Sequence, residues 1–189
     1  MKTIIDELKH TYEDILTLGE SHQRIELFDG ECIMTAMPST QHQRIATRLG
    51  IFLGLYIEKQ NIGVLFSSPV DVYLSKTTVF QPDVSFLSFE RSYIDDGKKL
   101  NGAPDLAIEI LSESTEDRDR TFKFREYAIG GAKEYWMVAP EKKEIEVYQN
   151  SDRGFKLIKI FKATDILNSP LLNEININVA AVFDTTIRK

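Results

Sequence analysis

The segment 105–111 limits the possible folds most strongly, because it places a carboxylate inside an otherwise apolar run. Side chains alternate between the two faces of a strand. One face carries Leu106, Ile108 and Ile110. The other carries Asp105, Ala107, Glu109 and Leu111. A carboxylate on such a face is costly unless it is paired or binds a metal. Glu109 therefore predicts a functional site, unless that face is open to solvent or Glu109 pairs with Lys123.

A second carboxylate opens the strand expected before this one. Pro82 and Asp83 precede the apolar residues Val84 and Phe86. Proline is tolerated at the first position of a strand, so we expect Asp83 at the end of the sheet. Oxygen ligands suit Mg²⁺, which usually takes only one or two protein carboxylates and keeps room for water and phosphate oxygens. Asp83 and Glu109 together favour a metal site that activates water against a phosphodiester.

Lys123 is the nearest candidate for a catalytic cation. It lies on a helix expected over residues 116–129, four positions after Asp119. Its ammonium could place positive charge on a phosphate. It could equally form a weak i, i+4 pair with Asp119 on an exposed helix face.

Composition limits the class of protein. A chain of 189 residues, 42% apolar and 28% charged, is typical of one globular domain spanning residues 1–189. No apolar run approaches the ~20 residues of a membrane helix, and acids near the N-terminus argue against a signal peptide, so we expect a cytoplasmic protein without a membrane partner. The net charge of −6 argues against a constitutive, tight binder of nucleic acid but does not exclude a nuclease.

The order of the expected elements favours an α/β or α+β fold, with a mixed sheet between helices. Helices are expected over 3–18, from Ser39 or Thr40 to Gly63, and over 116–129. Strands are expected at 24–28, 31–35, 64–67, 70–74, 82–87, 105–111, 134–138, 144–149 and 155–161. Asp29-Gly30 between the first two strands is a strong hairpin signal. The last three strands are expected to form an antiparallel meander.

Several motifs occur in a fixed order along the chain: residues 24–31 (RIELFDGE), His42, 81–83 (QPD), 102–112 (GAPDLAIEILS), Asp119, Lys123, Tyr127 and 131–138 (GAKEYWMV). Together these motifs resemble those of a large bacterial family of restriction endonucleases within the PD-(D/E)XK nuclease superfamily. The resemblance covers roughly residues 10 to 183. It implies a restriction-endonuclease-like core, a DNA substrate and cleavage that depends on Mg²⁺ or Mn²⁺.

The resemblance also assigns roles to residues. Asp83 corresponds to the first acid of the superfamily pattern and Glu109 to the second, and both would bind metal. The pattern expects a lysine two residues after the second acid, where this chain has Leu111. The family is thought to supply that lysine from the next helix, which Lys123 fits. His42 and Glu31 are secondary candidates for lining the site.

Two alternatives use the same fold without catalysis. The chain could bind nucleic acid without cleaving it, or it could be a protein-interaction domain, which the acidic balance favours. Cleavage of both DNA strands would favour a homodimer with two-fold symmetry.

Overall fold

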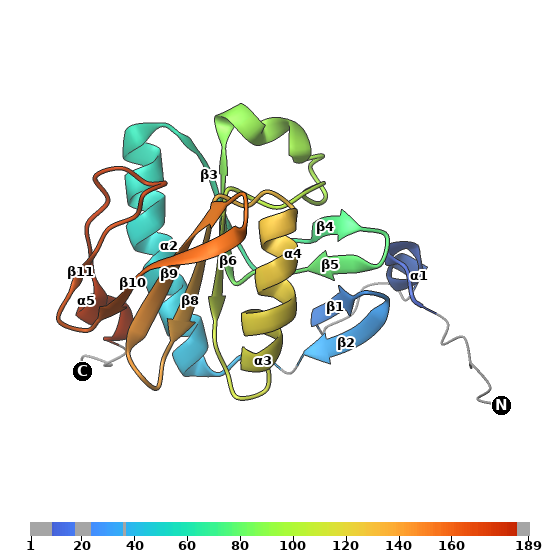
Figure 1. Ribbon diagram of the computed structural model, residues 1–189, viewed down its shortest axis with the longest axis horizontal. Coiled ribbons are helices and arrows are strands. Elements are labelled where there is room, and N and C mark those ends of the chain that lie inside the picture. The colour runs from blue at the N-terminus through green and yellow to red at the C-terminus, as the bar shows by residue number, and fades with distance from the viewer. Residues whose placement is uncertain (1–8, 18–23, 36, 185–189) are drawn as a thin grey trace.

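Two β-sheets lie at the centre of the fold, for which the computed structural model describes residues 9–17, 24–35 and 37–184 (Figure 1). Within these ranges, six strands form the larger sheet in the order β10-β9-β8-β7-β6-β3. They are β3 (Gly63–Ser67), β6 (Val84–Ser88), β7 (Leu106–Ile110), β8 (Glu134–Ala139), β9 (Glu144–Ser151) and β10 (Gly154–Lys162). β7 and β8 are parallel, and the other neighbouring pairs are antiparallel. The expected mixed sheet and its C-terminal antiparallel meander are confirmed.

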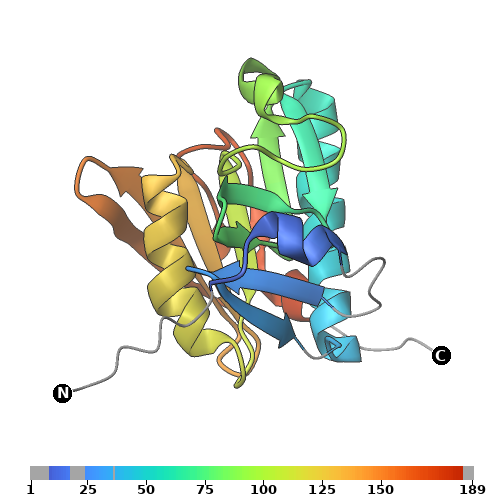
Figure 2. The same cartoon turned by 90° about the vertical axis from the view of Figure 1, so that its right-hand side faces the viewer.

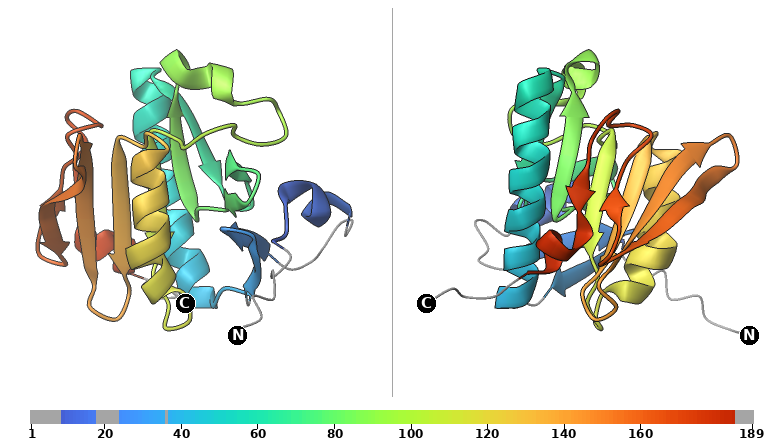
Figure 3. Two further views of the ribbon diagram at one scale, coloured as in Figure 1. Left: turned by 45° about the vertical axis from the view of Figure 1, so that its right-hand side comes forward. Right: turned by 90° about the vertical axis from the view of Figure 1, so that its left-hand side faces the viewer.

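Helices cover both faces of this sheet (Figure 3). The long helix α2 (Thr40–Gln60) packs on one face. Its apolar stripe recurs every four residues: Ile45, Leu49, Leu53 and Ile57. The other face is covered by α3 (Glu116–Arg118), a π-helical turn η2 (Asp119–Lys123) and α4 (Phe124–Ile129). The expected strand alternation is confirmed, because Ile108 packs in the α2 core while Ala107 packs with Tyr127 of α4.

The ends of α2 follow from local chemistry. Ser39 is the N-cap, and its side chain accepts a hydrogen bond from the backbone N–H of His42 at 3.2 Å. The helix ends at Gln60 because Asn61 adopts the left-handed conformation, with φ of 52°. Gly63, expected to end the helix, instead begins β3. A Cβ there would lie 2.2 Å from the carbonyl oxygen of Leu87, so the close approach of β3 and β6 requires glycine.

A smaller sheet lies beside the larger one (Figure 2). Among the described residues its order is β2-β1-β5-β4. The strands are β1 (Arg24–Phe28), β2 (Glu31–Thr35), β4 (Val72–Ser75) and β5 (Thr78–Phe80). The predicted hairpin is confirmed, with positive φ at both Asp29 and Gly30. The short strand β5 was not predicted. It connects β1 to β4, and its chain continues through Asp83 into β6.

The remaining elements are short. The helix expected over 3–18 lies partly outside the described residues, and its described part is α1 (Tyr12–Thr17). The expected loop 91–102 begins within a 3₁₀ turn, η1 (Phe89–Ile94). The C-terminal part holds β11 (Ile166–Leu167), β12 (Ile177–Asn178) and α5 (Val179–Phe183). In the described ranges, no helix has both the length and the apolar content needed to cross a membrane.

Glu134 fastens the C-terminal segment to the sheet. Its fully buried carboxylate accepts hydrogen bonds from Trp136 Nε1 at 2.9 Å, Ser169 Oγ at 2.8 Å and the Leu171 backbone N–H at 2.6 Å. The Leu171 donor bonds one oxygen, while Trp136 and Ser169 share the other. Burial raises the pKa of Glu134, and these three donors oppose that rise.

Replacing Glu134 by Gln should lower the free energy of unfolding by about 1–3 kcal/mol, because either orientation of the amide leaves at least one buried donor without an acceptor. Urea denaturation at pH 7 measures the change. Glu58→Gln, on an exposed position of α2, is the matched control and should change stability little. Equal stability of Glu134→Gln and Glu58→Gln would contradict the role given to Glu134.

Candidate active site

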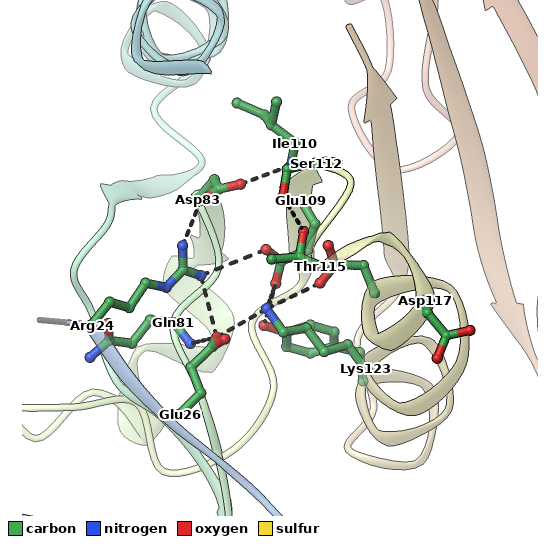
Figure 4. A network of polar contacts seen from close by, with 12 residues as sticks. Arg24, Glu26, Gln81, Asp83, Glu109, Ile110, Ser112, Thr115, Asp117 and Lys123 are labelled. Atoms are coloured by element: carbon green, nitrogen blue, oxygen red, sulfur yellow. Dashed lines mark hydrogen bonds and ion pairs between the residues drawn. The ribbon is translucent and has the colours of Figure 1, made fainter. Parts of the chain in front are cut away.

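A cavity of about 580 Å³ lies where the two sheets and both helical layers meet. Its walls come from β1, the start of α2, the junction before β6, the end of β7 and the helical segment 116–129. Carboxylates and cations from these elements face one another in it, as Figure 4 shows. Asp83, Glu109, Lys123 and His42 all line this cavity.

Strand pairing brings Asp83 and Glu109 together. β6 and β7 are antiparallel with Val84 opposite Ile108, so the next pair outward is Asp83 and Glu109. Both carboxylates contact the guanidinium of Arg24. Nη1 donates to Asp83 Oδ1 at 2.9 Å, and Nη2 lies 3.8 Å from Glu109 Oε2 (Figure 4). Asp83 also accepts a hydrogen bond from the Ile110 backbone N–H at 2.8 Å. The two acids therefore face one shared cation.

Lys123 is a buried counter-ion of this site. Its side chain is only 3% exposed, and its Nζ lies 3.0 Å from Glu109, 3.0 Å from Glu26 and 3.3 Å from Asp119. The alternative of a solvent-exposed pair with Asp119 is therefore wrong, although the i, i+4 contact itself exists. The π-helical turn η2 runs from Asp119 to Lys123, a geometry that often marks functional positions.

The two secondary candidates have different outcomes. His42, in the first turn of α2, has its Nε2 3.1 Å from Asp83 Oδ2. Glu31 is exposed and does not line the cavity. In the β1–β2 hairpin Glu31 pairs with Phe28 beside the turn, whereas the cavity-lining pair Arg24 and Thr35 is at the opposite end. The structure therefore does not bring Glu31 to the site.

Three further charged residues belong to the site and were assigned no role in it from the sequence, although all three lie in the motifs: Arg24, Glu26 and Asp119. Glu26 lies in the middle of the short strand β1, which is the same signal that identified Glu109. It accepts a hydrogen bond from the Gln81 backbone N–H at 2.8 Å. Arg24 has no comparable local signal, because its role depends on the position of β1 relative to β6 and β7.

The surroundings shift the pKa values of Asp83 and Glu109 in opposite directions. Burial alone would raise the pKa of Asp83, but the hydrogen bond with His42 and the charge of Arg24 lower it to about 2. Burial raises the pKa of Glu109 well above its usual range, and the Lys123 ammonium opposes this only in part. Burial would lower the pKa of Lys123, yet the charges of Glu109, Glu26 and Asp119 raise it, so Lys123 stays protonated. The site thus lowers the pKa of Asp83 and raises that of Glu109, its neighbour across the strand pair.

The carboxylate ligands of this site fit Mg²⁺ or Mn²⁺ better than a metal ion bound entirely by protein side chains. In the described part of the chain, no group of three or more His, Cys, Asp or Glu side chains is arranged to hold a metal ion. This does not fit a structural zinc site, which takes four protein ligands. Two carboxylates that face one cation do fit Mg²⁺ or Mn²⁺, with water and substrate oxygens completing the coordination.

Replacing Lys123 by Met should destabilise the fold by about 3–5 kcal/mol at pH 8, because it leaves buried carboxylates without their shared counter-ion. In the variant these carboxylates should titrate at higher pKa values in the folded than in the unfolded chain. Their protonated forms are then favoured by folding, so the deficit should shrink as the pH falls from 8 to 5.

Urea denaturation at both pH values measures this change. Lys156→Met, at an exposed position of β10, is the control and should show neither the loss nor its pH dependence. A deficit for Lys123→Met that stays constant with pH would contradict the counter-ion role.

Comparisons with known proteins found a matching family model and similar sequences. A family model described as "Uma2: Putative restriction endonuclease" matches residues 11–180. Two uncharacterized proteins of Synechocystis sp. (strain ATCC 27184 / PCC 6803 / Kazusa) are similar to the chain. One, slr1290, is 29% identical over 147 residues, covering 77% of this chain and 76% of the relative. The other, sll1609, is 29% identical over 156 residues, covering 77% and 88%.

A solved structure has the same fold. The crystal structure of a "putative nuclease belonging to DUF820" from Anabaena variabilis ATCC 29413 matches with a TM-score of 0.76 and 20% sequence identity. The match covers 92% of this chain and 97% of that chain. At this identity the likeness establishes a common fold.

Proposed function

Because this chain belongs to the Uma2 family, whose members are described as restriction endonucleases, we propose that it is a DNA endonuclease of the PD-(D/E)XK type that depends on Mg²⁺ or Mn²⁺. One observation carries the proposal. Asp83 and Glu109, from neighbouring strands, contact a single guanidinium, and the Lys123 ammonium lies 3.0 Å from Glu109. This arrangement has the two carboxylates and the lysine that such chemistry needs.

Each residue has a distinct role in this proposal. Asp83 and Glu109 would hold the metal, which when bound supplies an activated water and neutralises charge on the phosphate. Lys123 would present positive charge to the scissile phosphate. Glu26 and Asp119 hold the Lys123 ammonium at 3.0 and 3.3 Å, so that little reorganisation is needed during the reaction. Ile110 and His42 orient the Asp83 carboxylate through its Oδ2 atom.

The proposal extends to the assembly and its compartment. Cutting both strands of a duplex needs two sites of opposite orientation, which a two-fold homodimer provides. The compartment proposed is the cytoplasm.

The purified protein should nick or linearise plasmid DNA in Mg²⁺ or Mn²⁺ and not in EDTA. Asp83→Asn keeps the shape of the side chain but weakens a metal ligand, so it should reduce the cleavage rate by on the order of 10²-fold or more. Agarose gels with plasmid and single-stranded DNA measure the effect.

Asp152→Asn, in the exposed turn between β9 and β10, is the matched control and should cleave like wild type. Binding of DNA by wild type without cleavage in either metal would favour an inactive binding protein. Neither binding nor cleavage would favour a protein-interaction domain.

Divalent metal should also raise the melting temperature. A ligand that binds only the folded state stabilises it by about 2.7 kcal/mol at a concentration of 100 times its Kd. The wild type should therefore melt higher in Mn²⁺ than in EDTA, while Glu109→Gln should show a much smaller difference. Differential scanning fluorimetry measures this, and equal melting temperatures in all four samples would argue against a metal site.

A further inference from the structure

Arg24 lies between the two acids that are proposed to bind metal. Its Nη1 donates to Asp83 Oδ1 at 2.9 Å, and its Nη2 lies 3.3 Å from Glu26 Oε1 and 3.8 Å from Glu109 Oε2 (Figure 4). The guanidinium therefore spans one oxygen of each proposed metal ligand. A cation of single charge already neutralises the place where a divalent cation would bind.

Arg24 and a metal ion cannot use these oxygens together. Mg²⁺ binds carboxylate oxygens at about 2.0–2.1 Å and demands near-octahedral geometry. A guanidinium that is hydrogen-bonded to Asp83 and lies 3.8 Å from Glu109 would occupy part of that shell, and its charge would repel the metal. Metal binding would therefore require Arg24 to move away from Asp83 and Glu109.

The two cations of the site differ in how easily they can move. Lys123 is 3% exposed and is enclosed by three carboxylates, whereas Arg24 is 20% exposed and lines the open cavity. Arg24 is the first residue of β1, and its buried Nε has no hydrogen-bond partner among the described residues. Each cation contacts three carboxylates, so the greater exposure of Arg24 makes it the more replaceable of the two.

We propose that Arg24 is a replaceable counter-ion, which neutralises Asp83 and Glu109 in the metal-free protein and yields them to the divalent cation. This inference rests on the proposed function and adds a residue that controls metal affinity. Once displaced, the guanidinium remains beside the cavity. The planar guanidinium can donate two parallel hydrogen bonds to a phosphate group, so the displaced Arg24 would orient the substrate phosphate.

The test is the affinity for Mn²⁺ and Mg²⁺ without DNA, measured by isothermal titration calorimetry. Arg24→Gln removes the competing charge, so its affinity should be higher than that of wild type, on the order of tenfold. Arg24→Lys keeps the positive charge but loses the guanidinium that contacts both acids. Its affinity for metal should therefore lie between those of wild type and Arg24→Gln. Arg48→Gln, whose guanidinium lies 3.7 Å from Asp184, is the control and should bind metal like wild type.

If Arg24 only stabilised the fold, Arg24→Gln would bind Mn²⁺ and Mg²⁺ more weakly than wild type. A higher affinity of Arg24→Gln therefore indicates that Arg24 competes with the metal. The double variant Arg24→Gln with Glu109→Gln should lose the tighter binding, which places it at the same site. If Arg24→Gln unfolds, Arg24→Lys carries the test.

The outcomes distinguish the two proposals. If wild type binds metal and the Arg24 variants bind it equally or more weakly, the competition is overturned and the metal site stands. If neither wild type nor the Arg24 variants bind Mn²⁺ or Mg²⁺, both proposals are overturned. Metal binding that appears only in Arg24→Gln supports competition strongly.

Discussion

The structure of the site depends on one buried ammonium. Lys123 contacts Glu26 of the smaller sheet, Glu109 of the larger sheet and Asp119 of its own helical turn. Each of these carboxylates would be costly to bury without a cation, so their shared partner constrains three elements at once. The helical segment that covers the Glu109 face of β7 brings the Lys123 ammonium to this carboxylate. The ion pair with Glu26, together with the apolar cluster around Phe80 and Tyr127, holds the smaller sheet beside the larger one.

The parts of the fold that sequence predicted well are those with a strong local signal. The hairpin at Asp29-Gly30 needs two residues with positive φ, and the Ser39 cap precedes a long apolar stripe. The strand β5, only three residues long, is too short to show a periodic pattern and is fixed by its neighbours. The division of segment 116–129 into α-helical and π-helical turns was likewise not predicted, because the apolar spacing of a segment does not distinguish the two kinds of turn.

The candidate site shows the same limit at the level of single residues. Asp83 and Glu109 could be predicted from sequence because an acid at the end or in the middle of an apolar strand is costly to bury unless it is paired or binds a metal. Glu26 carries the same signal and could have been found by the same argument. Arg24 could not, because arginine at the start of a strand is ordinary. Its significance arises only when antiparallel pairing sets Asp83 and Glu109 side by side. Glu31, a secondary candidate for lining the site, lies outside the cavity because it pairs with Phe28 beside the hairpin turn, at the far end of the strand pair from Arg24.

The leucine at position 111 explains why the lysine comes from a helix. Residues 109 and 111 share a face of the chain, so a lysine at 111 would point toward the same side as Glu109. Leu111 instead packs with Tyr127 and other apolar residues under the helical segment. The helix that covers this face supplies the ammonium from the opposite direction, and it reaches the same carboxylate. The spacing between acid and lysine is then no longer fixed by the strand. It is fixed by the packing of the helix against the sheet and by the ion pair with Asp119 that holds Lys123 in its turn.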